Sequence, residues 1–153
     1  MKLWKRTIAI FLSTFFITAM PISVNALEET SITAPSAVLM EPETGKVLFE
    51  KNAHEIRACA SITKVMTLLL VFEAIDSNKL SMDETVTASA LAASMGGSDI
   101  WLEEGETMTV DEMIKATVVA SANDAAVALA EHLCGTEEEF VAKMNQRAKE
   151  LGM

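Results

Sequence analysis

The chain has 153 residues, which is room for one domain, and it carries 22 acidic against 12 basic side chains, a formal charge of −10. A surface this negative repels nucleic acid, so no nucleic-acid partner is expected. The two cysteines and two histidines show no tight ligand spacing, so we expect no metal site either.

Residues 1–26 have the three parts of an export signal. Three basic residues lie within the first six, residues 8–20 are an apolar run, and residues 24–26 form a small-residue cleavage site. We therefore expect export and cleavage near Ala26, with an uncleaved membrane anchor as the alternative. The remaining residues 27–153 carry nine basic and 22 acidic side chains, and no later segment has the roughly 18 unbroken apolar residues that cross a bilayer.

A β-hairpin is predicted after a polar lead-in over residues 27–35. Residues 36–41 and 46–51 are rich in residues that favour strands, and Pro42 to Gly45 between them have turn chemistry. The two cysteines, Cys59 and Cys134, lie after this hairpin. They could pair in an oxidising compartment, although nothing in the sequence fixes their separation.

An apolar helix with a polar start is predicted from residue 60 to about residue 76. Its apolar residues recur at helical spacing: Val65, Leu68, Leu69 and Phe72. Other apolar residues fill most of the remaining circumference, so we expect this helix to be buried nearly all round. Ser61 and Lys64 lie three residues apart at its start, on one face and beside unpaired backbone N–H groups.

This pair has the chemistry of an activated nucleophile. A hydroxyl needs a base before it can attack, and an amine can serve as that base only when it is neutral. Burial among apolar side chains and the positive end of a helix dipole both lower the pKa of a lysine amine, so the start of a buried helix suits the task. Ser-x-x-Lys also arises by chance in a chain of this size, so the assignment needs a wider pattern.

The rest of the chain is predicted to be mainly helical. An extended piece at residues 84–87, an alanine-rich helix at 88–94 and a turn at 95–98 come first. The turn has paired glycines and no Gly-Lys-Ser/Thr after them, so we interpret it as a connector and not as a phosphate loop.

Two capping boxes, at residues 109–112 and 136–139, open helices that run to residues 120 and 151. A third helix is predicted between them, over residues 125–133. Before it, the polar residues Ser121, Asn123 and Asp124 interrupt the apolar pattern. A helix cap accounts for one polar residue at such a position and not for three.

Ser61-Ile62-Thr63-Lys64, followed sixty residues on by Ser121-Ala122-Asn123, resembles the first two of three motifs of the penicillin-recognising serine acyl-transferases. The wider sequence is similar to the D-alanyl-D-alanine carboxypeptidases, the low-molecular-mass penicillin-binding proteins, over about residues 34–153. The stretches that carry this similarity are residues 37–48, 61–67, 93–98, 105–110 and 120–126.

The resemblance implies an α+β fold of the β-lactamase/DD-peptidase type, with helices packed on an antiparallel sheet. In this chain the domain would span residues 36–153, with the hairpin and the helical region but without the C-terminal strands. It also implies an extracytoplasmic protein of the cell wall. Membrane association would need a longer form, since members of the family often carry a C-terminal amphipathic anchor.

The resemblance also implies roles for four residues. Ser61 would attack the carbonyl between the last two D-alanines of a peptidoglycan stem peptide, and Lys64 would take the Ser61 proton. Ser121 would relay a proton to the leaving amine, and Asn123 would hold the substrate amide, both across a groove from Ser61. β-Lactams would be covalent inhibitors, and neither a metal nor an organic cofactor takes part.

One feature of the family pattern is missing. No Lys-Thr-Gly or Lys-Ser-Gly occurs, and in the family that motif supplies the charge that receives the substrate carboxylate and a nearby second oxyanion donor. Loss of one oxyanion donor typically costs 10²- to 10³-fold in rate, so we expect this chain to hydrolyse D-alanyl-D-alanine peptides poorly.

Two other readings stay open. A class A β-lactamase shares Ser-x-x-Lys and Ser-x-Asn, although Ala122 stands where that class has Asp and its deacylating Glu would lie beyond Met153. A non-catalytic cell-wall binding fragment that keeps the helical half of the fold is the second reading.

Overall fold

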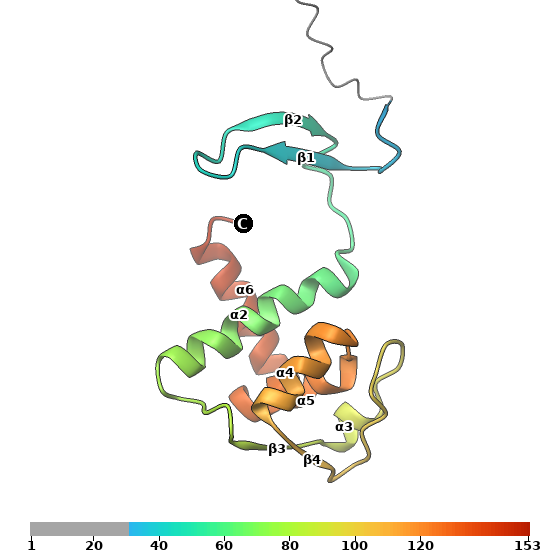
Figure 1. Cartoon of the computed structure of the whole chain (residues 1–153), viewed down its shortest axis with the longest axis vertical. Helices are drawn as coiled ribbons and strands as arrows, with labels where there is room; N and C mark the ends of the chain where they lie inside the picture. Colours follow the sequence, from blue (N-terminus) through green and yellow to red (C-terminus); the bar gives the residue numbers. More distant parts are fainter. Residues whose placement is uncertain (1–30) are drawn as a thin grey trace, which may run out of the picture. The chain divides into compact units, whose positions relative to one another are not determined.

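The structure is a computed structural model that describes residues 31–153 (Figure 1). The predicted export signal, its cleavage site and the first part of the lead-in lie outside the described residues. The chain divides after Arg57 into two compact units.

The first unit contains the predicted β-hairpin. β1 (Ala37–Met40) pairs with β2 (Val47–Lys51) in an antiparallel ladder in which Leu39 is opposite Phe49. The turn is closed by Glu41, whose carboxylate accepts the backbone N–H of Thr44 at 2.7 Å. This confirms the hairpin and its turn.

The second unit, residues 58–153, is helical with one small sheet. A 3-10 turn (Ala60–Ile62) leads into α2 (Thr63–Asp76), and the later helices are α3 (Ala90–Ala93), α4 (Val110–Val119), α5 (Asn123–Cys134) and α6 (Glu137–Glu150). β3 (Thr85–Thr87) and β4 (Thr107–Thr109) form an antiparallel pair. The sequence predicts β3 but not β4, because a three-residue strand gives little local signal beside the capping box that follows it.

α5 is the central helix of this unit and packs against α2, α3, α4 and α6 (Figure 1). Its buried face consists mainly of alanines, which let the neighbouring helices approach closely: Ala125, Ala126, Ala128 and Ala130. Around it lie fully buried larger side chains, among them Val71 of α2 and Met113 of α4. The core is therefore built on the helix that begins at Asn123.

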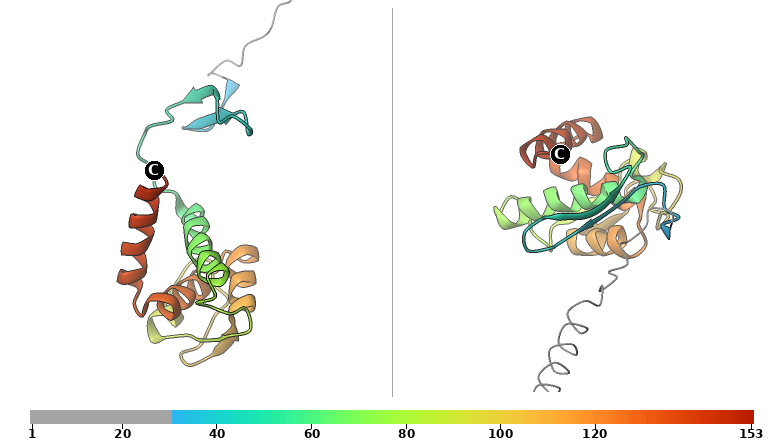
Figure 2. Two further views of the ribbon diagram at one scale, coloured as in Figure 1. Left: turned by 90° about the vertical axis from the view of Figure 1, so that its left-hand side faces the viewer. Right: turned by 90° about the horizontal axis from the view of Figure 1, so that it is seen from above.

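α2 and α6 lie next to each other (Figure 2). Phe140 of α6 is 2% exposed and belongs to one buried cluster with Leu70 of α2. Beside this apolar contact, the Arg147 guanidinium is 2.8 Å from the Glu73 carboxylate. These contacts hold α6 against one side of α2.

Within the second unit, α2 is not buried nearly all round as expected. Val65 is 66% exposed and Phe72 is 41% exposed, whereas Leu70, Val71 and Ala74 are buried. The described neighbours of α2 cover one of its faces only, and an apolar circumference does not show which side a neighbour will occupy.

Local signals located the other helices well. The Thr109–Glu112 capping box is formed in both directions at the start of α4, and the Thr136 hydroxyl accepts the N–H of Glu139 at the start of α6. Within the part of the chain that the structure describes, no helix is long and apolar enough to cross a membrane. Cys59 and Cys134 do not form a disulfide with each other.

Candidate active site

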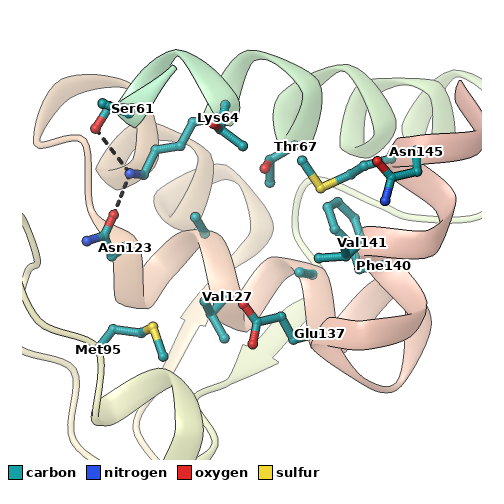
Figure 3. Close-up of a pocket in the computed structure, with 15 residues that line it drawn as sticks. Ser61, Lys64, Thr67, Met95, Asn123, Val127, Glu137, Phe140, Val141 and Asn145 are labelled. Carbon is teal, nitrogen blue, oxygen red and sulfur yellow. Dashed lines mark hydrogen bonds between the residues drawn. The ribbon is translucent and has the colours of Figure 1, made fainter. Parts of the chain in front are cut away.

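Ser61 and Lys64 lie where the 3-10 turn passes into α2 (Figure 3). The Lys64 Nζ is 3.4 Å from the Ser61 Oγ, so the predicted i,i+3 pair is in contact. Ala60, directly before Ser61, adopts the left-handed backbone conformation with φ of 46°. An L-residue in that conformation is strained, and such residues concentrate at functional sites.

The surroundings of this pair differ from the dehydrated start of a buried helix that the sequence suggested. Lys64 is half-buried and Ser61 is exposed. The difference follows from the one-sided packing of α2, which covers the amine better than the hydroxyl.

Asn123, the first residue of α5, reaches the same amine from the opposite side (Figure 3). Its Oδ1 accepts a hydrogen bond from Lys64 Nζ at 2.5 Å. Its Nδ2 donates to the carbonyl oxygen of Gly96 at 2.7 Å, so both ends of the amide are held. The structure thus brings together Ser61, Lys64 and Asn123, from two helices that are distant in sequence.

The backbone of Asn123 is held by the same loop. Its N–H donates to the carbonyl oxygen of Ser98 at 2.7 Å, in place of a side-chain cap on α5. Gly97 has φ of +93°, and a Cβ added there would lie 3.0 Å from Asn123 Nδ2. Residues 95–98, interpreted from the sequence as a connector, therefore contact a candidate site residue.

Asp124 is the next residue of α5 and is 1% exposed. Its carboxylate accepts the backbone N–H groups of Ile100 at 3.0 Å, Leu102 at 3.1 Å and Ala125 at 2.8 Å. Asp124 belongs to the polar interruption seen in the sequence, but neither its spacing nor the family resemblance assigns it a role. The available signal was an acidic residue beside a run of alanines, where a carboxylate must find partners inside the protein.

Ser121 lies between α4 and α5, half-buried, with a left-handed φ of 55°. It does not line the pocket that holds the other three residues, and within residues 31–153 no hydrogen bond joins its hydroxyl to Lys64 or Ser61. Its proton-relay role stays a prediction.

The site opens into a pocket of about 640 Å³ between α2, α5 and α6 (Figure 3). Ser61, Lys64 and Asn123 lie at one end, and apolar side chains such as Phe140 and Met144 line the other. No group of metal-ligating side chains occurs among the described residues. A hydroxyl beside an amine that is itself held by an amide is an arrangement for nucleophilic attack with base assistance.

The chain is similar to proteins of known family. The sequence profile of the D-alanyl-D-alanine carboxypeptidases matches residues 23–153. D-alanyl-D-alanine carboxypeptidase DacF of Bacillus subtilis is 59% identical over 120 residues, which are 78% of this chain and 31% of that protein. DacC of Escherichia coli is 36% identical over 133 residues, covering 83% of this chain and 33% of that protein.

Solved structures agree with the sequence matches. The carboxypeptidase DacD from Francisella tularensis superposes with a TM-score of 0.77 at 40% identity, over 84% of this chain and 30% of that one. Penicillin-binding protein D2 from Listeria monocytogenes, in its ampicillin-bound form, gives a TM-score of 0.72 at 34% identity, over 82% of this chain and 50% of that one. These likenesses confirm the predicted α+β, DD-peptidase-like fold.

The chain spans about a third of the length of the curated relatives it matches. The matched part includes every residue of the pocket described above. The profile match covers most of the chain, and the chain therefore belongs to the D-alanyl-D-alanine carboxypeptidase family.

Proposed function

We propose that this protein acts as a serine-type D-alanyl-D-alanine carboxypeptidase, which removes the terminal D-alanine of peptidoglycan stem peptides through an acyl-enzyme. The observation that carries the proposal is the contact of Lys64 Nζ with both Ser61 Oγ, at 3.4 Å, and Asn123 Oδ1, at 2.5 Å. The names of the relatives support the substrate class.

In the first half of the reaction, Lys64 takes the proton of the Ser61 hydroxyl while Oγ attacks the carbonyl carbon of the penultimate D-alanine. The tetrahedral intermediate collapses, the peptide C–N bond breaks, and the departing D-alanine amine receives a proton. Ser121 relays that proton, and the backbone N–H of Ser61 donates to the oxyanion. The 3.4 Å contact is long for a proton transfer, and such contacts commonly shorten when substrate binds.

In the second half, water attacks the Ser61 ester and releases the shortened peptide. Asn123 has two tasks in this scheme: its oxygen holds the Lys64 amine, and its amide group contacts the substrate amide. Since Nδ2 donates to Gly96 in the free protein, substrate binding has to share or replace that hydrogen bond.

β-Lactams are the covalent inhibitors that this scheme predicts, since they would acylate the same Ser61 oxygen. The ampicillin-bound form of the Listeria monocytogenes protein supports this prediction. A substrate in the cell wall also requires an extracytoplasmic protein, in agreement with the export signal proposed for residues 1–26.

Acylation tests the proposal directly. The 153-residue protein is incubated with a fluorescent penicillin, and its intact mass and peptide map are recorded over time. We expect a long-lived adduct on Ser61, absent from Ser61→Ala and retained in Ser94→Ala, which removes an exposed serine outside the pocket. A wild-type protein without an adduct contradicts the proposal, and fast release of hydrolysed penicillin indicates a β-lactamase instead.

Peptide hydrolysis is the second measurement. Release of D-alanine from a synthetic peptide ending in D-Ala-D-Ala is compared for the wild-type protein and Ser61→Ala. Because no Lys-Thr-Gly or Lys-Ser-Gly occurs in the sequence, we expect slow turnover by the wild-type protein and none by Ser61→Ala. Equal turnover by both proteins would show that Ser61 is not the nucleophile.

A further inference from the structure

The buried Asp124 carboxylate has no role in the reaction scheme above. It is 1% exposed, and its hydrogen-bond donors are the backbone N–H groups of Ile100, Leu102 and Ala125. Two of these donors belong to the segment of residues 96–102, which we call the 96–102 loop. Backbone N–H donors to a carboxylate form charge-assisted hydrogen bonds, which are stronger than neutral ones.

The first half of the same loop contacts Asn123. The Gly96 carbonyl accepts the Asn123 Nδ2 hydrogen, and the Ser98 carbonyl accepts the Asn123 backbone hydrogen, both at 2.7 Å. The loop is therefore attached to α5 at both of its ends, once through Asn123 and once through Asp124.

The conformation of the loop shows that these attachments restrain it. Trp101, between the two N–H groups that Asp124 accepts, has φ of 58° and is 83% exposed. A bulky residue rarely adopts the left-handed conformation without compensation from its surroundings. Here the compensation is the pair of hydrogen bonds that Ile100 and Leu102 donate to Asp124.

We propose that Asp124 is a positioning residue: by fixing the 96–102 loop it holds the Gly96 and Ser98 carbonyls on Asn123, and so holds the Asn123 amide on Lys64. The sequence of contacts runs from the Asp124 carboxylate through the loop backbone to the Asn123 amide and the Lys64 amine. The catalytic consequence, slower acylation of Ser61, rests on the proposed function, whereas the positioning itself does not.

A purely structural role is the competing explanation. A carboxylate in the first turn of a helix is stabilised by the helix dipole and by unpaired N–H groups, with no effect on Asn123. The two explanations differ in one observable, which is the state of the Asn123 side-chain amide when the Asp124 carboxylate is removed.

Asp124→Asn keeps the shape of the side chain but removes its negative charge and one acceptor oxygen. The hydrogen bonds from the loop then lose their charge assistance, and at least one of the three backbone N–H groups loses its acceptor. We expect hydrogen exchange of the Asn123 side-chain NH2, measured by NMR on the isotopically labelled 153-residue protein, to accelerate about tenfold or more. Asp99→Asn is the matched control: it removes a negative charge from the same loop without removing an acceptor that the loop uses, and should leave the exchange unchanged.

Faster exchange at the Ile100 and Leu102 backbone amides, with an unchanged Asn123 side chain, would overturn the proposal in favour of the structural role. Should Asp124→Asn fail to fold, Gly97→Ala tests the loop from its other end. An added Cβ there lies 3.0 Å from Asn123 Nδ2, whereas at Gly105, with a similar φ of +83°, it meets nothing within 4 Å. Faster Asn123 exchange in Gly97→Ala but not in Gly105→Ala supports the link between the loop and Asn123 on which the proposal depends, and equal exchange in both overturns it.

The rate of Ser61 acylation is measured separately from hydrogen exchange. In Asp124→Asn the rate of penicillin adduct formation on Ser61 should fall about tenfold or more relative to Asp99→Asn. A wild-type protein that forms no adduct contradicts the proposed function, while the Asn123 exchange rates still decide whether Asp124 positions the amide.

Discussion

Lys64 Nζ lies 2.5 Å from Asn123 Oδ1 and 3.4 Å from Ser61 Oγ, so the amine is held more closely by the amide than by the hydroxyl it is proposed to activate. This asymmetry gives Asn123 a second proposed role, which is to hold the proposed base, in addition to its proposed contact with the substrate. Removing the Asn123 side chain should therefore slow acylation of Ser61 even by small β-lactams, which do not need every contact that a peptide substrate makes.

Asn123→Ala should slow acylation of Ser61 by about 100-fold, because displacement of a catalytic group by about 1 Å can cost that much. The rate of penicillin adduct formation, followed by intact mass, measures the effect. Asn145→Ala is the control, since Asn145 lines the other end of the same pocket. Equal rates in the two variants would show that the Lys64–Asn123 contact has no part in the reaction.

Lys64→Arg separates the charge of the base from its ability to lose a proton. A guanidinium keeps a positive charge and hydrogen-bond donors but does not deprotonate in proteins. We expect acylation to fall by about 10² to 10⁴, the usual contribution of a general base. Lys115→Arg, on the exposed face of α4, should acylate at the wild-type rate. A Lys64→Arg protein that acylates normally would exclude Lys64 as the base.

Phe140→Ala should loosen α6, because the ring fills the cluster shared with Leu70 of α2 and Ala130 of α5. Truncation of a buried phenylalanine costs about 3–5 kcal/mol of unfolding free energy. Denaturant unfolding followed by circular dichroism measures this loss. Val141→Ala, at a neighbouring position that is 43% exposed, should cost much less. Similar losses in both variants would contradict the described packing of α6.

Thr109→Ala should weaken the start of α4 and make that loss depend on pH. Loss of a threonine N-cap costs about 1 kcal/mol. Hydrogen bonds from the Thr109 backbone and side chain hold the pKa of Glu112 below its ordinary value of 4.5. A lowered carboxyl pKa stabilises the fold above the ordinary value, and this stabilisation disappears as the pH falls through the lowered one.

The difference in melting temperature between the wild-type protein and Thr109→Ala should therefore be largest near neutral pH and shrink as the pH falls below 4.5. Thr107→Ala, on the exposed part of β4, is the comparison variant. A difference that stays constant from pH 7 to pH 3 would show that the hydrogen bond from the Thr109 hydroxyl does not help to lower the pKa of Glu112.

Local patterns predicted what depends on neighbours in the sequence. Ser61 and Lys64 were predicted to meet because residues three apart share a helical face, and the Thr109 cap because its partner is three residues away. The approach of Asn123 to Lys64 spans 59 residues, and only the family resemblance indicated that they share a site. No spacing rule joins residues so distant in the chain.

The corrections have the same physical origin. The exposure of Val65 depends on which side of α2 the other helices occupy, and the pairing of Thr107 to Thr109 depends on a strand more than twenty residues earlier. Asp124 shows the limit most clearly. Its polarity was visible in the sequence, but the N–H groups of Ile100 and Leu102 that it accepts became neighbours only through folding.

The buried alanines of α5 limit which substitutions the candidate site can tolerate. Ala125 and Ala128 of this helix, and Ala122 directly before it, are at most 1% exposed. A larger side chain at any of them would have to push a whole neighbouring element outward. Such a displacement would move Asn123, which begins the same rigid helix, away from the lysine it holds. Substitutions at these alanines, none of which lines the pocket, should therefore abolish reactivity before they abolish folding.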